Sequence, residues 1–414
     1  MALTTSERAL LDPIASRHDA IVAELAHVVG IPTGTGHHTG LDACRAWFRA
    51  KLESLGATCS EIAGTPAPAW LREGDRGTKE HEHASRIPPV LVAHRNHPSP
   101  KLRLLLCGHI DTVHDPLGSF NKLTIAPDGK KATGPGCADM KGGLLVALEA
   151  LAAITRAGLP VSWTFAMNSD EESGSFQSDK ALREVAGRGF DYGLVFEPAM
   201  PDGGLVVERP ASSQFMIECR GKAAHVGRDF TSGISAVTAL AHAVLEASKI
   251  ADPANGLIVS VGPLEGGSAT NIVPDVARAW GNVRAFSPAA ESLAAEKLRE
   301  LETKSQTLPT TKVHYILSRP AKPQTPAVSH LANIAQACSN DLQAIGRGVA
   351  MPFGKTGGVC DGNNLLAVGL PVIDTLGVRG GGLHTTSEWI DLESLTQRAQ
   401  LTAILISRLI EQTL

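Results

Sequence analysis

An apolar segment that ends in polar residues decides the predicted fold: LRLLLCGHID at positions 102–111. A short continuous apolar run such as Leu102–Cys107 is typical of a strand that is buried on both faces of a sheet. His109 and Asp111 follow this run directly, so they fall at the carboxyl end of the predicted strand. The same order, a buried strand followed by polar residues, recurs along the chain.

Strand patterns alternate with helical patterns in the first half of the sequence. We predict strands at Val90–Ala93, Leu102–Cys107, Val161–Asn168 and Tyr192–Phe196, and helices at about 6–29, 40–55 and 140–156. Alternating strands and helices indicate an α/β fold, here an open, mostly parallel sheet with helices on both faces. In such sheets, ligands bind beyond the carboxyl ends of the strands.

The pattern changes after about residue 204. Strand, helix, strand, strand, helix and strand patterns follow at 213–220, 232–250, 256–264, 276–286, 291–301 and 312–317. This order is typical of a small α+β layer, one sheet covered by two helices. The α/β pattern then resumes and ends in a predicted helix over 392–414. We therefore predict one domain from residues 1–204 and 319–414, with a second domain, residues 205–318, inserted into it.

Composition narrows the class of protein. A chain of 414 residues exceeds the usual size of a single core, which favours two domains. The formal net charge is -4 without a basic block, which argues against nucleic acid and favours a small-molecule partner. No apolar core of a signal peptide and no run long enough for a bilayer is visible, so we expect no membrane association. Seven dispersed cysteines, with no Cys-x-x-Cys pair, predict reduced thiols in a cytoplasmic protein.

Two polar motifs are candidate metal ligands. His109 could bind a metal through one ring nitrogen while Asp111 steadies it as an outer partner, although a His-x-Asp turn without metal is commoner. Asp139 stands in GPGCADMKGG at 134–143 and could lend one oxygen to each of two ions. An isolated Asp before a helix is, however, more often a cap.

The acidic cluster NSDEESGS at 168–175 follows the strand Val161–Asn168. Successive acids at a strand end are costly unless they are solvated or balanced by cations. Of the neighbours Glu171 and Glu172, one could hold a metal while the other acts as a base beside it. In the polar stretch 64–86, which we expect to be a surface loop, the triplet at 81–83, His-Glu-His, is more typical of solvated surface than of a metal site.

Glu197, in Phe-Glu-Pro, and His384, in GGGLHT at 380–385, complete the set. Nitrogen and oxygen ligands without thiolate suit zinc, with manganese or cobalt as substitutes. Five ligands, one of them bridging, are too many for one catalytic zinc but suit two ions about 3.5–4 Å apart. The five residues that we predict as ligands are His109, Asp139, Glu172, Glu197 and His384.

Four motifs, in order and spacing, resemble the di-zinc metallopeptidase family of glutamate carboxypeptidase, aminoacylase, acetylornithine deacetylase and succinyl-diaminopimelate desuccinylase. They are GHIDTV at 108–113, the glycine-rich segment 134–143, DEESGS at 170–175 and FEP at 196–198. The bacterial glutamate carboxypeptidase branch is the most similar. The resemblance implies that His109 and Glu197 hold one zinc, that Glu172 and His384 hold the other, and that Asp139 bridges them.

The same resemblance assigns the remaining roles. It implies that Glu171 is the general acid/base and that Asp111 lies behind the ligands. The inserted domain is then a lid that also forms a homodimer. Within the lid, His225 in GKAAHVG would reach a substrate carbonyl, and Asn271 in TNIVP would polarise or hold the substrate. Arg319 in Ser-Arg-Pro matches an arginine associated with the substrate carboxylate.

Gly358 lies in GGVCDGN at 357–363, where relatives often read Gly-Gly-Thr-Asp-Ala. This segment lines the substrate end of the family's site. The expected reaction is hydrolysis of an amide bond beside a free carboxylate, in a peptide or an N-acyl-amino acid. A deacylase or dipeptidase of the same family is the first alternative. The second is a metal-dependent binding protein without catalysis, which should have lost a ligand or Glu171, and neither is lost.

Overall fold

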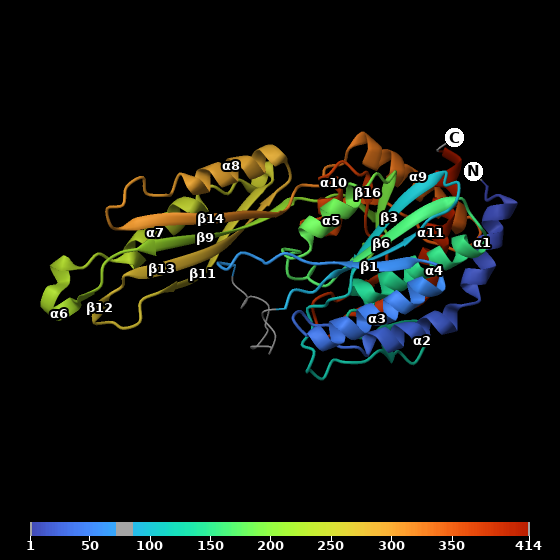
Figure 1. Ribbon diagram of the computed structural model, residues 1–414, viewed down its shortest axis with the longest axis horizontal. Helices are drawn as coiled ribbons and strands as arrows, with labels where there is room; N and C mark the ends of the chain where they lie inside the picture. Colours follow the sequence, from blue (N-terminus) through green and yellow to red (C-terminus); the bar gives the residue numbers. More distant parts are fainter. Residues whose placement is uncertain (1, 72–85, 413–414) are drawn as a thin grey trace.

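The computed structural model describes residues 2–71 and 86–412. They form a large unit, in which both ends of the chain lie, and an elongated arm that extends from it (Figure 1). The large unit is built from the segments before residue 209 and after residue 322, and the arm from the segment between them. The domain limits at 204/205 and 318/319 stay a prediction.

A six-stranded sheet in the order β1-β2-β6-β3-β7-β16 is the centre of the large unit. The strands β6, β3, β7 and β16 pair in parallel, whereas β1 and β2 are antiparallel additions at one edge. The α/β prediction is therefore confirmed, with a sheet that is mixed rather than wholly parallel. The strands are β1 (Thr58–Ile62), β2 (Val90–Arg95), β3 (Leu102–His109), β6 (Val161–Asn168), β7 (Tyr192–Val195) and β16 (Val372–Ile373).

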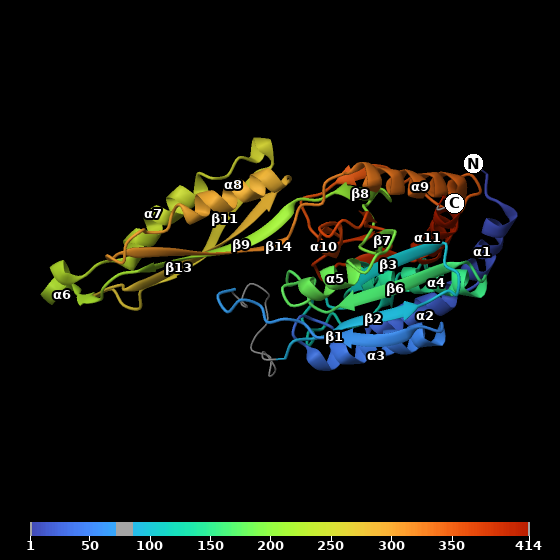
Figure 2. The same cartoon turned by 45° about the horizontal axis from the view of Figure 1, so that its top comes forward.

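Helices cover both faces of this sheet (Figures 1 and 2). Leu104 and Leu106 of β3 belong to the core on one face, and Leu105 and Cys107 belong to the core on the other. This alternation explains the continuous apolar run of β3, because a strand between two helical layers has no solvated side. The first face carries α1 (Thr5–Ala15), α2 (His18–Val29), α3 (His38–Ser54), α4 (Gly143–Arg156), α9 (Pro326–Gln343) and α11 (Glu393–Gln412); the second carries α5 (Asp179–Ala186) and α10 (Asp361–Leu366).

The first helix differs from the prediction. The single helix expected over 6–29 is two helices, α1 and α2, which are separated at Ser16 and Arg17. Arg17 leaves the helical pattern and donates to both carboxylate oxygens of Glu149, at 2.8–3.0 Å, in the neighbouring α4. An apolar periodicity cannot reveal this break, since the residue that causes it pairs with a partner 132 positions away.

The arm holds an antiparallel sheet in the order β11-β13-β9-β14 with two helices on one face (Figure 2). Its strands are β9 (Ala211–Arg220), β11 (Leu257–Gly266), β13 (Val276–Ala285) and β14 (Thr310–Arg319), and its helices are α7 (Ala236–Ser248) and α8 (Pro288–Arg299). At the far tip lie β10 (Ala224–His225), α6 (Val226–Asp229) and β12 (Ile272–Val273) (Figure 1). The predicted α+β layer is thus present.

The two chain crossings between the units are held together. Arg209 and Lys322 exchange backbone hydrogen bonds of 2.9 Å. Both side chains bind the fully buried Asp374, which follows β16, at 2.7 and 3.1 Å. Burying these charges is tolerable only because each is paired. The chain therefore enters and leaves the arm at one buried cluster of charges, formed by Arg209, Lys322 and Asp374.

Two small sheets complete the large unit. The strand β8 (Leu205–Glu208) pairs in parallel with β15 (Phe353–Lys355). The other sheet has the order β17-β18-β5-β4 and joins β4 (Thr124–Ile125), β5 (Lys131–Thr133), β17 (Gly380–Gly381) and β18 (Trp389–Asp391). It fixes the turn that carries His384 beside the segment that carries Asp139.

The stretch 64–86 is predicted as a surface loop, and the part of it that the structure describes contacts the arm. Trp280 of the arm donates its indole N–H to the Trp70 carbonyl at 2.8 Å, and the Trp70 ring lies 5.8 Å from that of His314. The predicted solvated triplet at 81–83 lies outside the described residues. Across those residues, no helix combines the length and the apolarity that a membrane span requires.

Candidate metal centre

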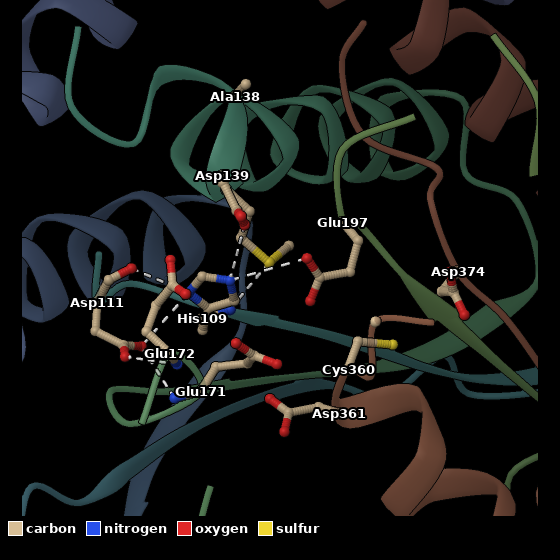
Figure 3. Close-up of polar contacts among 12 residues, drawn as sticks. His109, Asp111, Ala138, Asp139, Glu171, Glu172, Glu197, Cys360, Asp361 and Asp374 are labelled. Atoms are coloured by element: carbon tan, nitrogen blue, oxygen red, sulfur yellow. Dashed lines mark hydrogen bonds and ion pairs between the residues drawn. The ribbon is translucent and has the colours of Figure 1, made fainter. Parts of the chain in front are cut away.

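The end of β3 places His109 at the centre of a buried cluster (Figure 3). Its Nδ1 lies 3.0 Å from the Asp111 carbonyl oxygen, which can only accept, so this nitrogen carries the proton. The other nitrogen, Nε2, lies 3.3 Å from Asp139 Oδ1 and 3.9 Å from Glu197 Oε2. A fixed tautomer with a free Nε2 is the usual arrangement of a metal-binding histidine.

A second cluster shares Asp139 with the first. His384 Nε2 lies 3.5 Å from Asp139 Oδ2 and 3.3 Å from Glu172 Oε2. The two oxygens of Asp139 therefore face different groups of ligands. In each group the candidate ligand atoms lie within 4.8 Å of one another. All five residues predicted as metal ligands are brought together, in two triads with one carboxylate in common.

The backbone around Asp139 is specialised for this position. Gly136 has a φ of +70°, and a Cβ there would lie 2.5 Å from Thr112 Cγ2. Asp139 itself is not helical, with φ -112° and ψ 93°, and its peptide bond to Met140 is cis. The helix predicted from 140 becomes a regular α-helix only at Gly143, the first residue of α4. Asp139 is therefore not a simple helix cap, because the chain turns its carboxylate toward both histidines.

Asp111 organises the acidic turn from behind. Its carboxylate is fully buried and accepts the backbone N–H groups of Glu171, at 3.2 Å, and Glu172, at 3.0 Å. These contacts direct the two neighbouring side chains to different places, as Figure 3 shows. Glu172 belongs to the second triad, whereas Glu171 lies below His109 and points toward the arm's last strand.

The electrostatics of the cluster favour a cation. Burial and the nearby Asp139 raise the pKa of Glu172 to about 8, and burial raises the pKa of Glu197 well above its usual range. Burial would lower the pKa of His109, but the nearby carboxylates of Asp111 and Asp139 raise it well above its usual range. Four buried ligand atoms have no hydrogen-bond partner among the described residues: His109 Nε2, Asp139 Oδ1, Glu172 Oε1 and Glu197 Oε1.

Unpaired buried acceptors of this kind are costly. In each triad the candidate ligand atoms lie within 4.8 Å of one another, and their imidazole nitrogens and carboxylate oxygens are the donor chemistry of divalent transition metals. The residues present therefore fit a metal centre.

Arg319 and Glu171 are in direct contact. Arg319 Nη2 donates to Glu171 Oε1 at 2.6 Å, to its carbonyl oxygen at 2.9 Å and to Ser175 Oγ at 2.8 Å. Arg319 is the last residue of β14, so the strand that returns from the arm ends on the acidic turn. Asp361 lies 3.7 Å from the same guanidinium and accepts from Ser175 at 2.5 Å.

Arg284, which no sequence motif singles out, lies on β13 near Arg319 and Glu171. Its Nη1 is buried without a partner among the described residues. Burial and the neighbouring Arg319 lower the pKa of its guanidinium. Gly358 lies on the large unit's side of the crossing, where its carbonyl accepts from Arg209 at 3.2 Å. No local pattern marks Arg284, since its strand alternates like any half-buried strand.

His225 and Asn271 lie far from the metal cluster within one chain. Both are exposed at the tip of the arm, where the Val226 N–H donates to the Asn271 carbonyl at 3.0 Å (Figure 1). The structure thus brings these two residues to each other but not to the ligands.

A mixed α/β sheet whose strand ends hold two carboxylate–histidine triads defines a candidate metal centre. The sequence of residues 105–408 matches the family model described as "Peptidase family M20/M25/M40". The chain belongs to this family. It is a metal-dependent hydrolase that acts on peptide or amide bonds.

Curated relatives agree along most of the chain. Carboxypeptidase G2 of Pseudomonas sp. (strain RS-16) is 29% identical, with 97% of this chain and 92% of the relative covered. Succinyl-diaminopimelate desuccinylase of Psychrobacter arcticus is 25% identical, with 89% and 90% covered. Among solved structures, a tripeptidase from Staphylococcus aureus has a TM-score of 0.72 at 23% identity and covers 95% of this chain and 99% of its own.

Metal should stabilise the fold through Asp139. Adding zinc to chelator-treated protein should raise the free energy of unfolding by about 2.7 kcal/mol when free zinc is about 100 times its dissociation constant. Asp139→Asn removes the carboxylate shared by both triads, so its thermal unfolding midpoint should respond far less. Differential scanning calorimetry with and without zinc measures both. An equal response in Asp139→Asn and the unchanged protein would show that metal binds elsewhere.

Proposed function

We propose that this chain is a di-zinc hydrolase that cuts an amide bond next to a free carboxylate, in the manner of a glutamate carboxypeptidase. The observation that carries the proposal is Asp139, whose two oxygens face separate triads. His109 and Glu197 would hold one zinc, and Glu172 and His384 the other. Manganese and cobalt accept the same donors and are possible substitutes. The free cysteines of the chain support a cytoplasmic location.

The residues around the centre would perform the proton transfers. Zinc ions in such a centre supply Lewis acidity and an activated water. Glu171 takes the proton from the attacking water and delivers it to the leaving amine. Glu171 is 8% exposed and lies on the same acidic turn as Glu172, but it belongs to neither of the two groups of candidate ligands. Arg319 would bind Glu171 Oε1, and the other carboxylate oxygen of Glu171 would accept the proton.

The two neighbouring glutamates should separate metal binding from catalysis. Glu171→Gln should retain both ions and lose turnover by a factor of about a hundred to ten thousand, as is typical of a lost general acid/base. Glu172→Gln should lose metal affinity, because it removes a charged ligand. Metal analysis beside steady-state kinetics distinguishes the two variants. The reverse pattern, with zinc lost from Glu171→Gln and kept by Glu172→Gln, would exchange the two roles.

Two arginines at the base of the arm would recognise the substrate carboxylate. Arg319 is the residue that the sequence suggests for this clamp, and Arg284 lies beside it with an unpaired Nη1. A planar guanidinium suits a carboxylate well. Gly358, at the neighbouring crossing, would line the substrate end. A deacylase or dipeptidase would use the same centre with a different pocket, and a panel of N-acyl-amino acids and dipeptides distinguishes these substrates.

Free acids and their amides should reveal which arginine binds the carboxylate. In Arg284→Ala, activity should fall on the free acid alone, by the 1.5–3 kcal/mol of a hydrogen bond to a charged group. In Arg319→Ala, activity on both substrates should fall, because Glu171 loses its partner, and the acid should lose more. Comparing kcat/KM on each acid–amide pair measures this. If neither variant discriminates between acid and amide, the carboxylate binds elsewhere.

The arm would act as a lid and as the surface of a homodimer. Its β11 is an edge strand, and Ile258 and Leu264 on it are 46% and 55% exposed. An exposed edge with apolar side chains is a natural pairing surface. A two-fold axis at this edge would make the contact self-complementary. It would let His225 and Asn271 at one tip approach the metal centre of the partner, where His225 stabilises the developing oxyanion.

A mixing experiment tests the shared site. His225→Ala should lose roughly 2.7–4 kcal/mol of transition-state stabilisation, as is typical for an oxyanion donor. When it is mixed with inactive Glu171→Gln under conditions that exchange subunits, each heterodimer contains one site with both residues intact, so activity should return. If the subunits exchange and the mixture stays inactive, His225 does not act in the partner's site.

A further inference from the structure

The buried Glu388 contacts three of the segments that carry the metal ligands. Its side chain is 1% exposed. Oε1 accepts the backbone N–H groups of Ala138, at 2.8 Å, and Asp139, at 3.0 Å. Oε2 accepts the N–H of Gly136 at 3.0 Å and lies 2.6 Å from His114 Nε2. All four donors converge on one carboxylate from segments about 250 residues distant in sequence.

Together these contacts link the segments of three candidate ligands, Asp139, His109 and His384. Ala138 and Asp139 belong to the segment whose carboxylate is shared by both triads. His114 follows His109 and Asp111 on the segment after β3. Glu388 itself closes the turn that starts at His384, since its N–H donates to the Thr385 carbonyl at 3.1 Å. Its own carbonyl accepts from Gly134 at 3.2 Å, so backbone and side chain hold the same pair of segments.

Regular secondary structure cannot fix Asp139 in place. The backbone there departs from helical angles, and the regular hydrogen bonding of α4 begins only at Gly143. The N–H groups that precede a helix lack partners within the helix and need an acceptor from elsewhere. Glu388 supplies that acceptor as an anion, whose hydrogen bonds are stronger and shorter than neutral ones. Asp111 does the same for the N–H groups of Glu171 and Glu172.

We propose that Glu388 is a positioning residue of the metal centre, which holds the Asp139 segment against the His384 turn. The proposal rests on the ligand set of the proposed function. Loss of the Glu388 carboxylate should weaken chiefly the binding of the ion held by Asp139, Glu172 and His384, because His384 lies on the same turn as Glu388. His109, by contrast, ends a central strand of the sheet and is held by its own hydrogen bond to Asp111.

Metal titration of the full chain tests this role. The variant is Glu388→Gln, which keeps the side-chain volume but places an amide N–H₂ group opposite backbone N–H donors. The matched control is Glu393→Gln, at an exposed position five residues away. Metal-free proteins are titrated with zinc against a chromophoric chelator, and bound zinc is counted by elemental analysis. We expect two ions for the unchanged protein and for the control. In Glu388→Gln one ion should bind about 10–100-fold more weakly, the usual effect of losing an outer-sphere partner.

A second readout separates positioning from stability. At saturating zinc, kcat of Glu388→Gln should return to within a few-fold of the unchanged protein, because Glu388 touches no substrate. If the unchanged protein binds two ions and Glu388→Gln binds both equally well, the proposal is overturned. If the unchanged protein binds no zinc, the proposed function fails instead.

His114→Phe provides a milder variant in case Glu388→Gln does not fold. It removes one of the four contacts of the Glu388 carboxylate and leaves the three hydrogen bonds from backbone N–H groups in place. The same ion should then bind a few-fold more weakly. Unchanged affinity for both ions in His114→Phe would overturn the proposal in that case.

Discussion

The concentration of buried negative charge at the strand ends is the constraint on which the rest of the structure depends. Asp111, Asp139, Glu171 and Glu197 are each less than 10% exposed, and Glu172 lies among them. Burying one uncompensated carboxylate costs several kcal/mol, so five within one site require cations. Arg319 supplies part of this charge, and metal bound at the two triads would supply the rest. The fold is therefore arranged around a metal centre.

The same constraint links the arm to the chemistry. Arg319 ends the strand that returns from the arm, and its guanidinium is bound to Glu171, so the orientation of the arm and that of Glu171 are set together. Arg284 lies on β13, on the other side of β9 from Arg319, and its Nη1 has no partner among the described residues. In the proposed reaction, recognition of a free acid and preparation of Glu171 as a base would both depend on this small group of charges.

How much could be predicted from the sequence depends on how local each signal is. The grouping of the candidate ligands was predictable because a buried strand followed by a polar residue is a pattern within a few positions, as at His109 and Glu197. The sheet and the α+β arm were predictable for the same reason. The break at Arg17, the contact of Arg319 with Glu171 and the role of Arg284 were not, because each depends on a partner in a distant segment. In the sequence, Glu388 is an ordinary acidic residue shortly before α11. Only the fold brings Gly136, Ala138 and Asp139 into contact with it.

The position of the arm's tip gives the last step of the synthesis. His225 and Asn271 form a polar pair at an exposed end, where His225 Nδ1 accepts from the Gly227 N–H and the Asn271 carbonyl accepts from the Val226 N–H. The apolar edge of β11 lies along the same arm, and covering it would remove a costly exposed surface. An association that buries this edge also moves the tip toward a second molecule. In the proposed function, one chain supplies the candidate metal ligands and Glu171, and the association that protects the edge would bring His225 of a second molecule to that site.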